Sequence, residues 1–424
     1  MKTIVFVDSN PGGLAAIETA KRMGFRAVFV KSNRFAPLYS SEQSQRRIAM
    51  ADRVISIDDC FDPSQLDAAL LSELDSGGID ALVTVLSFAV VPLAEAARRL
   101  GLRFTNVEAV RAACSKNECR KLAERHGLPP VKCVETRTDA DIRAAVAQIG
   151  FPVLIKPAIS AGSMGAHKVR NAEELDRYFV ESRRERDQFP MRLGSDHLSE
   201  LILVEEFIEG PLISVEIGRT VDGTIIPFVV GERTLDKMNP VLELGTTMPA
   251  LINEEMQQAA IEQASLVIRA IGLDIGIFHI EFIASSAGPR LVEVNPRIMG
   301  GNLPALFGFV SDEDLFEWLI RIHLGENPKK DRFTFHRSLC SRLVAADKPG
   351  YVQQALATQE LQSLRARTVL FNLAVLEGQP VEEYSHTFNG VGHFVVGGED
   401  PFDARRKAEE IVGELSGLLG LALK

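Results

Sequence analysis

The sequence has few cysteines, and their spacing matches neither a metal site nor a disulfide framework. Five cysteines occur among 424 residues, at positions 60, 114, 119, 133 and 340. Cysteine pairs that bind zinc or form disulfides in small secreted domains follow recognisable spacings, which are absent here. Cys114 and Cys119 fall in one predicted helix, where we interpret them as packing residues. The pattern indicates a reducing compartment, and we expect a cytoplasmic protein.

The sequence also lacks excess positive charge and long apolar runs. Its net charge of −10 disfavours a nucleic-acid partner. No apolar run is long enough to span a bilayer, and no signal peptide precedes the first predicted strand. No short-period repeat is visible. The 46% hydrophobic content and the length predict two to four globular domains with large cores, without a membrane or nucleic-acid partner.

Residues 1–108 alternate between strands and helices. Apolar runs at 3–7, 27–30, 53–57 and 81–85 are separated by helical patterns, which predicts a doubly wound parallel sheet covered by helices. The first turn contains Gly12 and Gly13 but no G-x-G-x-x-G, so dehydrogenase activity has only weak support. Ser87 follows the fourth strand, at the carboxyl edge where such sheets bind ligands.

The segment 291–301 carries three polar side chains on an otherwise apolar strand. Glu293, Asn295 and Arg297 alternate along it, so we expect them to line one wall of a cleft. An upstream strand over 276–282 places His279 and Glu281 on one of its faces. A hairpin turn over 285–288 sets Glu281 across from Glu293.

This hairpin predicts a metal and phosphate site. Two carboxylates and an amide oxygen suit Mg²⁺, which leaves other positions for water and phosphate. Arg297 would face the phosphate, and Gly300 and Gly301 would offer backbone N–H groups to an oxyanion. A surface hairpin with satisfied charges is the alternative. We favour the metal site, because unused charge on an apolar hairpin is costly.

Two further segments of the chain have features of nucleotide contacts. A helix over 109–126 carries Lys116. An apolar strand over 151–157 ends near Lys156 and precedes a loop of small residues that includes Ser160, Gly162, Ser163 and Gly165. Small residues let a backbone close over phosphates. This is not the G-x-x-x-x-G-K-[ST] loop, and taken alone a plain Gly/Ser hairpin explains it equally well.

The strand over 201–210 ends in an acidic hinge. Its residues Glu205, Glu206, Phe207 and Ile208 precede a glycine. An edge strand running into such a hinge can offer backbone groups to an adenine ring. Two strands over 213–220 and 224–231 follow, joined by an Asp-Gly turn at 222–223.

These segments occur in the order of the ATP-grasp superfamily, which the chain resembles over residues 110–310. The resemblance is carried by Lys116, the strand ending at Lys156 with its small-residue loop, the hinge at 205–208, Glu281, and the Glu293-x-Asn295-Pro296-Arg297 end strand. It implies an ATP-grasp fold of two α+β lobes behind the N-terminal domain. The implied domains are 1–108, a lid lobe at 109–210, a metal-binding lobe at 211–345, and an α+β subdomain at 346–424.

The resemblance implies that ATP lies between the lobes. Lys116, Lys156 and the loop with Ser160, Gly162, Ser163 and Gly165 would touch its phosphates, and the hinge at 205–208 would hold adenine. Glu281, Glu293 and Asn295 would hold Mg²⁺, with two ions expected and Mn²⁺ as a substitute. Many members hold the ribose with a glutamate two residues after the hinge glycine. This chain has Leu212 there, and Glu216 is the replacement we consider.

The 295–301 ending is most similar to carboxylate–amine ligases of the L-amino-acid ligase type. These enzymes form an acyl phosphate that an amine attacks. Arg297, Gly300 and Gly301 would be catalytic, and Arg297 and Gly300 would also hold the acid. Residues 232–249 are interpreted as a polar loop beside the acceptor pocket, where Glu243 and His279 would contact substrate. A solvated surface loop is the alternative for Glu243.

The leading hypothesis is an ATP-dependent ligase that joins an amino acid to an amine, which is itself expected to be an amino acid. The alternative is a member that activates bicarbonate, as biotin carboxylase and the purine-pathway carboxylase do. A catalytically silent nucleotide-binding protein is a third class, and intact metal ligands argue against it. The tail after residue 346 is interpreted as structural, with a homodimer surface as one use.

Overall fold

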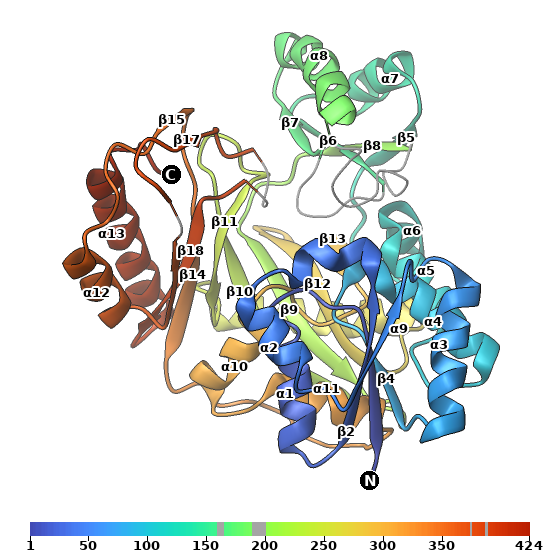
Figure 1. The fold of residues 1–424 in the computed structure, drawn as a ribbon. Helices are drawn as coiled ribbons and strands as arrows, with labels where there is room; N and C mark the ends of the chain where they lie inside the picture. Colours follow the sequence, from blue (N-terminus) through green and yellow to red (C-terminus); the bar gives the residue numbers. More distant parts are fainter. Residues whose placement is uncertain (159–164, 189–200, 374, 386–388) are drawn as a thin grey trace.

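The computed structural model describes residues 1–158, 165–188, 201–373, 375–385 and 389–424. The described chain builds three larger sheets and one two-stranded sheet. Figure 1 shows the N-terminal domain in blue, a lid of strands and helices in teal and green, and a large mixed-colour sheet beside them. The expected mixture of α/β and α+β architecture is confirmed.

The N-terminal domain contains the predicted parallel sheet, and its four strands have the order β3-β2-β1-β4. Most of its branched and aromatic strand residues are buried, including all of β1, whereas Val54 of β3 is exposed. Helices lie on both faces of the sheet (Figure 1). The elements are β1 (Thr3–Val7), α1 (Ala15–Arg22), β2 (Arg26–Ser32), η1 (Asn33–Tyr39), α2 (Glu42–Ile48), β3 (Arg53–Ile57), α3 (Pro63–Ser76), β4 (Ala81–Val83) and α4 (Ser87–Leu100).

Two helices, α5 (Val107–Cys114) and α6 (Lys116–Arg125), replace the single helix predicted over 109–126, which was wrong. The chain turns at Ser115, whose φ and ψ of −106° and 106° are extended. The Ser115 hydroxyl donates to Asn117 Oδ1 over 2.6 Å, and such local side-chain bonds compete with helical backbone bonds. Because α6 starts afresh at Lys116, that side chain points into the protein and is only 8% exposed.

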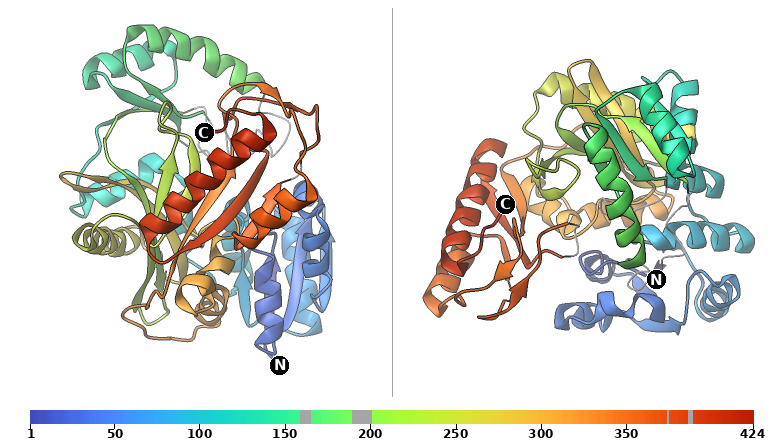
Figure 2. Two further views of the ribbon diagram at one scale, coloured as in Figure 1. Left: turned by 90° about the vertical axis from the view of Figure 1, so that its left-hand side faces the viewer. Right: turned by 90° about the horizontal axis from the view of Figure 1, so that it is seen from above.

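The lid is an antiparallel sheet of order β5-β8-β6-β7 with two helices on one face (Figure 1). A separate hydrophobic cluster built from its own strands and helices fills it, so the lid has the packing of an independent body. Figure 2 shows it standing apart from the C-terminal helices. Its elements are β5 (Cys133–Thr136), α7 (Asp139–Ile149), β6 (Val153–Pro157), β7 (His167–Val169), α8 (Ala172–Gln188) and β8 (Ile202–Glu206).

The largest sheet has eight antiparallel strands in the order β13-β12-β9-β10-β11-β14-β18-β16. Strands from the C-terminal tail therefore extend the sheet of the preceding lobe. The strands are β9 (Leu212–Arg219), β10 (Ile225–Leu235), β11 (Glu243–Met248), β12 (Gly276–Ser285), β13 (Gly288–Asn295), β14 (Ser338–Val344), β16 (Leu370–Leu373) and β18 (Gly392–Gly398), with β15 (Gly350–Tyr351) and β17 (Pro380–Val381) forming the two-stranded sheet.

Helices cover this sheet on both faces. Helix α9 packs on β9, β12 and β13, and α13 packs on β14 and β18, while α11 packs on β12 from the other face. Figure 2 shows α13 lying along the strands it covers. The helices are α9 (Glu254–Ile271), α10 (Leu303–Ser311), α11 (Leu315–His323), α12 (Thr358–Ala366) and α13 (Pro401–Leu419).

The polar loop predicted over 232–249 was wrong, because most of it is sheet. Glu232 pairs with Thr247 and Arg233 with Thr246 across β10 and β11. The polar side chains suggested a solvent-exposed loop, but they are buried and hydrogen-bonded to one another. Arg233 Nη1, for example, donates to Thr246 Oγ1 over 2.9 Å. A short connection over 236–242 is what remains of the loop.

One aromatic cluster joins α10 and α11 to the large sheet. Phe228, which is 2% exposed, contacts the rings of Phe307, Trp318 and Phe333 with centroids 5.0 to 6.2 Å apart. The core that contains Phe228 continues into the N-terminal domain. The lobe and the domain therefore share one hydrophobic interior.

We expect Phe228→Ala to lower the free energy of unfolding by about 3–5 kcal/mol, because it leaves a cavity in this cluster. Urea unfolding followed by tryptophan fluorescence measures the change. Phe402→Ala is the matched control, because Phe402 is 66% exposed and should shift stability by about 0.5 kcal/mol or less. Equal effects of the two substitutions would contradict the assigned core.

Candidate functional site

The β12–β13 hairpin brings the predicted metal ligands together. Glu281 lies opposite Glu293 and His279 opposite Asn295, with an irregularity in the register directly after Glu281. Asn295 Nδ2 donates to Glu293 Oε1 over 2.9 Å. The tight connection after Ser285 would by itself pair Glu281 with Val292, so the extra residue at this irregularity is what sets Glu293 opposite Glu281 and on the same face.

Lys116 neutralises one of these carboxylates. Its ammonium lies 3.0 Å from Glu293 Oε2. Burial alone would raise the pKa of Glu293, but the Lys116 ammonium and the Asn295 amide lower it to about 2. Glu293 is therefore ionised at neutral pH, and it faces a cation that helix α6 delivers.

Arg233 neutralises the other carboxylate, and the sequence analysis did not single it out. Its Nη2 lies 3.3 Å from Glu281 Oε1, and its Nε lies 2.9 Å from Glu243 Oε2. Burial and the charge of Glu293 would raise the pKa of Glu281, but His279 and Arg233 hold it below its usual value. A signal existed in the sequence, since Arg233 sits on an apolar strand pattern where an unpaired guanidinium would be costly.

His279 holds Glu281 from behind. Its Nε2 lies 3.0 Å from Glu281 Oε1, and its Nδ1 contacts the Glu216 carboxylate. Burial lowers the pKa of His279, but these carboxylates raise it to about 9 overall. The ring is 3% exposed with both nitrogens engaged, so we assign it to positioning Glu281 instead of the substrate contact that the sequence suggested.

Glu216 is buried as well, and it links the hairpin to the loop beyond it. Its second oxygen accepts from the Met299 N–H over 2.9 Å, and the residue is 1% exposed. A ribose could not reach it without displacing both partners. The structure thus argues against Glu216 as the replacement for a ribose-binding glutamate at Leu212.

Glu243 begins β11 and stays partly exposed. Its side chain is 31% exposed and is paired with Arg233. Burial raises the pKa of this carboxyl, although Arg233 opposes the shift. Glu243 thus shares a cation with Glu281, at the edge of the same cluster.

Arg297 extends the line of polar groups beyond the end of β13. Its Nη2 donates to Asn295 Oδ1 over 3.4 Å and its Nε to Ser87 Oγ over 2.7 Å. The N-terminal domain thereby reaches the site through the first residue of α4, the carboxyl-edge position that the sequence indicated. Burial lowers the pKa of Arg297, which still leaves a guanidinium charged at neutral pH.

The glycines after Arg297 border open space. A Cβ at Gly300 or Gly301 would meet nothing within 4 Å, and Gly301 has a φ of +62° that favours glycine. Behind them, a Cβ at Gly12 would lie 2.0 Å from the Gly301 carbonyl oxygen. The β1–α1 turn is thus pressed against the loop that follows Arg297, and Gly12 is required for that contact.

A second charged cluster lies at the lid hinge. Lys156 Nζ lies 3.0 Å from Glu205 Oε2, and Arg120, which the sequence analysis missed, contacts the other oxygen of Glu205. Burial raises the pKa of Glu205, yet Arg120 and Lys156 lower it overall. Burial lowers the pKa of Lys156 to about 8.

The remaining hinge residues are partly engaged inside the lid. The N–H groups of Glu206 and Phe207 donate to the Lys132 and Pro152 carbonyls over 3.0 and 3.2 Å. Lys168 Nζ lies 3.6 Å from the centre of the Phe207 ring. Those two N–H groups are therefore not available to an adenine ring. An adenine at the hinge would have to hydrogen-bond to backbone carbonyl oxygens or to the backbone of Ile208.

The predicted phosphate loop is only partly described. Ser160, Gly162 and Ser163 lie outside the described residues. Gly165 is described, with a φ of +70° and the Pro157 ring within 3.2 Å of an added Cβ. It closes the connection from β6, which carries Lys156, back to β7.

The donor set fits a magnesium ion shared with a ligand. Among the described residues, no group of three or more His, Cys, Asp or Glu side chains is arranged to hold a metal. Two carboxylates and one amide from β12 and β13 are hard oxygen donors that leave most positions free. Mg²⁺ is commonly held in this way, with phosphate and water completing the shell.

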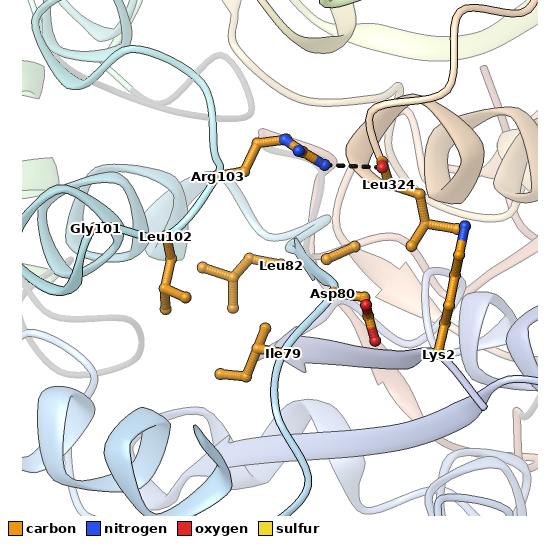
Figure 3. Close-up of a pocket in the computed structure, with 9 residues that line it drawn as sticks. Lys2, Ile79, Asp80, Leu82, Gly101, Leu102, Arg103 and Leu324 are labelled. Atoms are coloured by element: carbon orange, nitrogen blue, oxygen red, sulfur yellow. Dashed lines mark hydrogen bonds between the residues drawn. The ribbon is translucent and has the colours of Figure 1, made fainter. Parts of the chain in front are cut away.

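A separate cavity lies far from these groups. Its volume is about 350 Å³, and Figure 3 shows the side chains that line it. Asp80 Oδ2 accepts from the Thr3 N–H over 2.7 Å, and Arg103 Nη1 donates to the Leu324 carbonyl over 2.8 Å. The cavity lies at the amino-terminal edge of β1 and β4, opposite Ser87, and these polar groups are already paired. We assign it no part in the site.

Two family models match this chain. The family described as ATP-grasp domain matches residues 149–304, and the family described as ATP-grasp N-terminal domain matches residues 17–103. An uncharacterised protein of Sinorhizobium fredii is 29% identical over 60% of this chain and 50% of its own length. Alanine–anticapsin ligase of Bacillus amyloliquefaciens is 26% identical over 54% of this chain and 50% of its own. The chain spans about half the length of these curated relatives.

Solved structures share the whole architecture. An L-amino acid ligase from Bacillus licheniformis superposes with a TM-score of 0.79 at 17% identity, covering 100% of this chain and 98% of that one. An ADP complex of N5-carboxyaminoimidazole synthetase from Staphylococcus aureus gives a TM-score of 0.71 at 14% identity, covering 97% of each chain. The fold predicted from the motifs is confirmed. In the described residues, no helix combines the length and apolar character needed to cross a bilayer.

Glu293→Gln should weaken divalent-cation binding at least about tenfold, because it removes one of the two carboxylates predicted to bind the ion. Titration with Mn²⁺ followed by electron paramagnetic resonance, with ADP present, measures this. The control is Glu262→Gln, an exposed carboxylate on α9. Unchanged Mn²⁺ affinity in Glu293→Gln, with the protein folded, would remove the carboxylate pair as the metal site.

Proposed function

We propose that this chain, a member of the ATP-grasp superfamily, is an ATP-dependent ligase that activates a carboxylic acid and couples it to an amine. The observation that carries the proposal is the line from Glu293 through Asn295 to Arg297, with Lys116 beside it and open space in front of Gly300. The similarity to alanine–anticapsin ligase supports an amino acid as the acid, and a second amino acid as the amine.

The proposed reaction has two steps. A carboxylate oxygen of the acid attacks the γ-phosphorus of ATP, the bond to the β-phosphate oxygen breaks, and ADP leaves. The amine then attacks the carbonyl carbon of the acyl phosphate, phosphate leaves, and the amine nitrogen loses a proton. The products are an amide, ADP and phosphate.

Each charged group of the site has a part in this scheme. Arg297 would grip the carboxylate and then the anionic intermediate, because its guanidinium offers two parallel donors. Ser87 and Asn295 fix the orientation of that guanidinium. Glu243, exposed at the edge of the cluster, would hold the ammonium of an amino-acid substrate. Lys116 and Lys156 would face the phosphates.

Glu281, Glu293 and Asn295 would hold Mg²⁺. The bound ion would supply neutralisation of phosphate charge in the transition state. Two ions, with Mn²⁺ as a substitute, belong to the same proposal. The homodimer expected from the sequence stays a prediction.

A carboxylase that activates bicarbonate is the second candidate, because N5-carboxyaminoimidazole synthetase shares the fold. The two candidates differ at Gly300. A bicarbonate ion has no side chain, whereas the open space beside Gly300 leaves room for one.

Phosphate release from MgATP distinguishes the candidates. It should be stimulated by a pair of amino acids, with a dipeptide detected by mass spectrometry. Release with bicarbonate alone, unaffected by any amino acid or amine, would replace the ligase with the carboxylase. Nucleotide binding without phosphate release under every condition would indicate the silent class.

Arg297→Lys should lower kcat on the order of 10²-fold or more, because an ammonium cannot reproduce the planar two-bond contact. The readout is steady-state phosphate release with the amino-acid pair that gives the highest rate in the wild type. Arg290→Lys is the matched control, because Arg290 lies near the start of β13, away from the line of polar groups at its end. A kcat near the wild-type value in Arg297→Lys would exclude Arg297 from the transition state.

ATP affinity should fall as the pH rises past about 8, since the pKa of Lys156 lies there and only its protonated form attracts phosphate. Bound phosphate favours the protonated ammonium, so ATP affinity is highest below pH 8. Above pH 8 the affinity drops up to about tenfold for each pH unit. Calorimetric titration with a non-hydrolysable ATP analogue between pH 6.5 and 9.5 tests this. In Lys156→Arg the slope should flatten, and a wild-type slope in that variant would contradict the assignment.

A further inference from the structure

Arg120 joins three parts of the molecule. It lies on α6, four residues after Lys116, so the two side chains share one face of the helix. Its Nη1 contacts Glu205 of β8 in the lid, and its Nη2 donates to the Val292 carbonyl of β13 over 3.1 Å. Helix α6 itself packs on β13 and α9 of the large lobe. Arg120 therefore crosses from the metal-binding sheet to the lid hinge.

Glu205 is shared between two cations. It is 2% exposed, with Arg120 on one oxygen and Lys156 3.0 Å from the other. The trio carries one net positive charge, and all three side chains are at most 12% exposed. A buried carboxylate with one remaining cation would hold that cation firmly, because leaving a buried charge unpaired is strongly unfavourable.

Resting on the proposed function, we infer that Arg120 is a positioning residue that keeps Glu205 neutralised, so that Lys156 can turn from Glu205 to the phosphates of ATP. Once Lys156 moves, Arg120 and Glu205 form a neutral buried pair, and Lys156 brings its whole charge to the nucleotide. The bond to Val292 holds the Arg120 guanidinium at the hinge while this exchange takes place.

The chain offers an independent contrast in Lys121, the next residue on α6. Lys121 pairs with Glu118 and Glu135 and is 47% exposed. Surface pairs of this kind contribute little to stability. Lys121→Met therefore removes the same charge from the same helix without touching Glu205.

The experiment measures the affinity of the full chain for MgATP and for a non-hydrolysable analogue, without acid or amine. Arg120→Met should weaken binding on the order of tenfold or more, with Arg120→Lys recovering most of the loss and Lys121→Met unchanged. In steady-state assays the KM for ATP should rise in Arg120→Met while kcat at saturating ATP changes little. Urea unfolding of each variant checks that it is folded.

The double variant Arg120→Met/Glu205→Gln distinguishes a positioning role of Arg120 from a purely structural one. With Glu205 neutral, Lys156 has no carboxylate to hold it, so affinity should recover from the Arg120→Met value. A purely structural Arg120 predicts further loss, because two buried contacts are then gone. Wild-type affinity in folded Arg120→Met, or no recovery in the double variant, would overturn the inference. Absence of ATP binding in the wild type would instead remove the proposed function, and the inference with it.

Discussion

The site depends on charge neutralisation inside an antiparallel sheet. Glu216, Glu281 and Glu293 lie on adjacent strands, where uncompensated carboxylates would repel one another and resist burial. Cations from other elements form ion pairs with two of these carboxylates: Arg233 of β10 with Glu281, and Lys116 of α6 with Glu293. The hairpin can present two ionised carboxylates only because these partners are built around it.

The same cations explain how the parts of the chain are held in relation to one another. Lys116 ties α6 to β13, Arg120 ties β13 to the lid, and Arg297 ties the end of β13 to α4 through Ser87. Each connection ends at or next to a proposed reactive group. The same contacts thus hold the N-terminal domain, the lid and the large sheet together and fix the geometry of the proposed site. A preorganised site needs such support.

Much of the fold was predictable because its signals are local. Alternating strands and helices predicted the parallel N-terminal sheet, and the turn after Ser285 predicted the β12–β13 hairpin. The irregularity after Glu281, which sets Glu293 opposite it, has no such local signal. Buried ion pairs were not predictable in this way. Arg120 and Arg233 find their partners 85 and 48 residues away, and no period in the sequence connects them. The same long-range pairing made the polar strand β11 look like a loop.

The buried positions also narrow the substrate side of the site. The sequence suggested that His279 contacts substrate and that Glu216 contacts the ribose. In the structure, His279 contacts Glu281, and Glu216 accepts a hydrogen bond from the Met299 N–H. What stays accessible at the edge of the cluster is Glu243, which is 31% exposed, and the open space beside Gly300. In the proposed ligase, Glu243 would face the ammonium of an amino acid and the open space would take its side chain. Bicarbonate would use neither, which is why the ligase accounts for more of this structure than the carboxylase does.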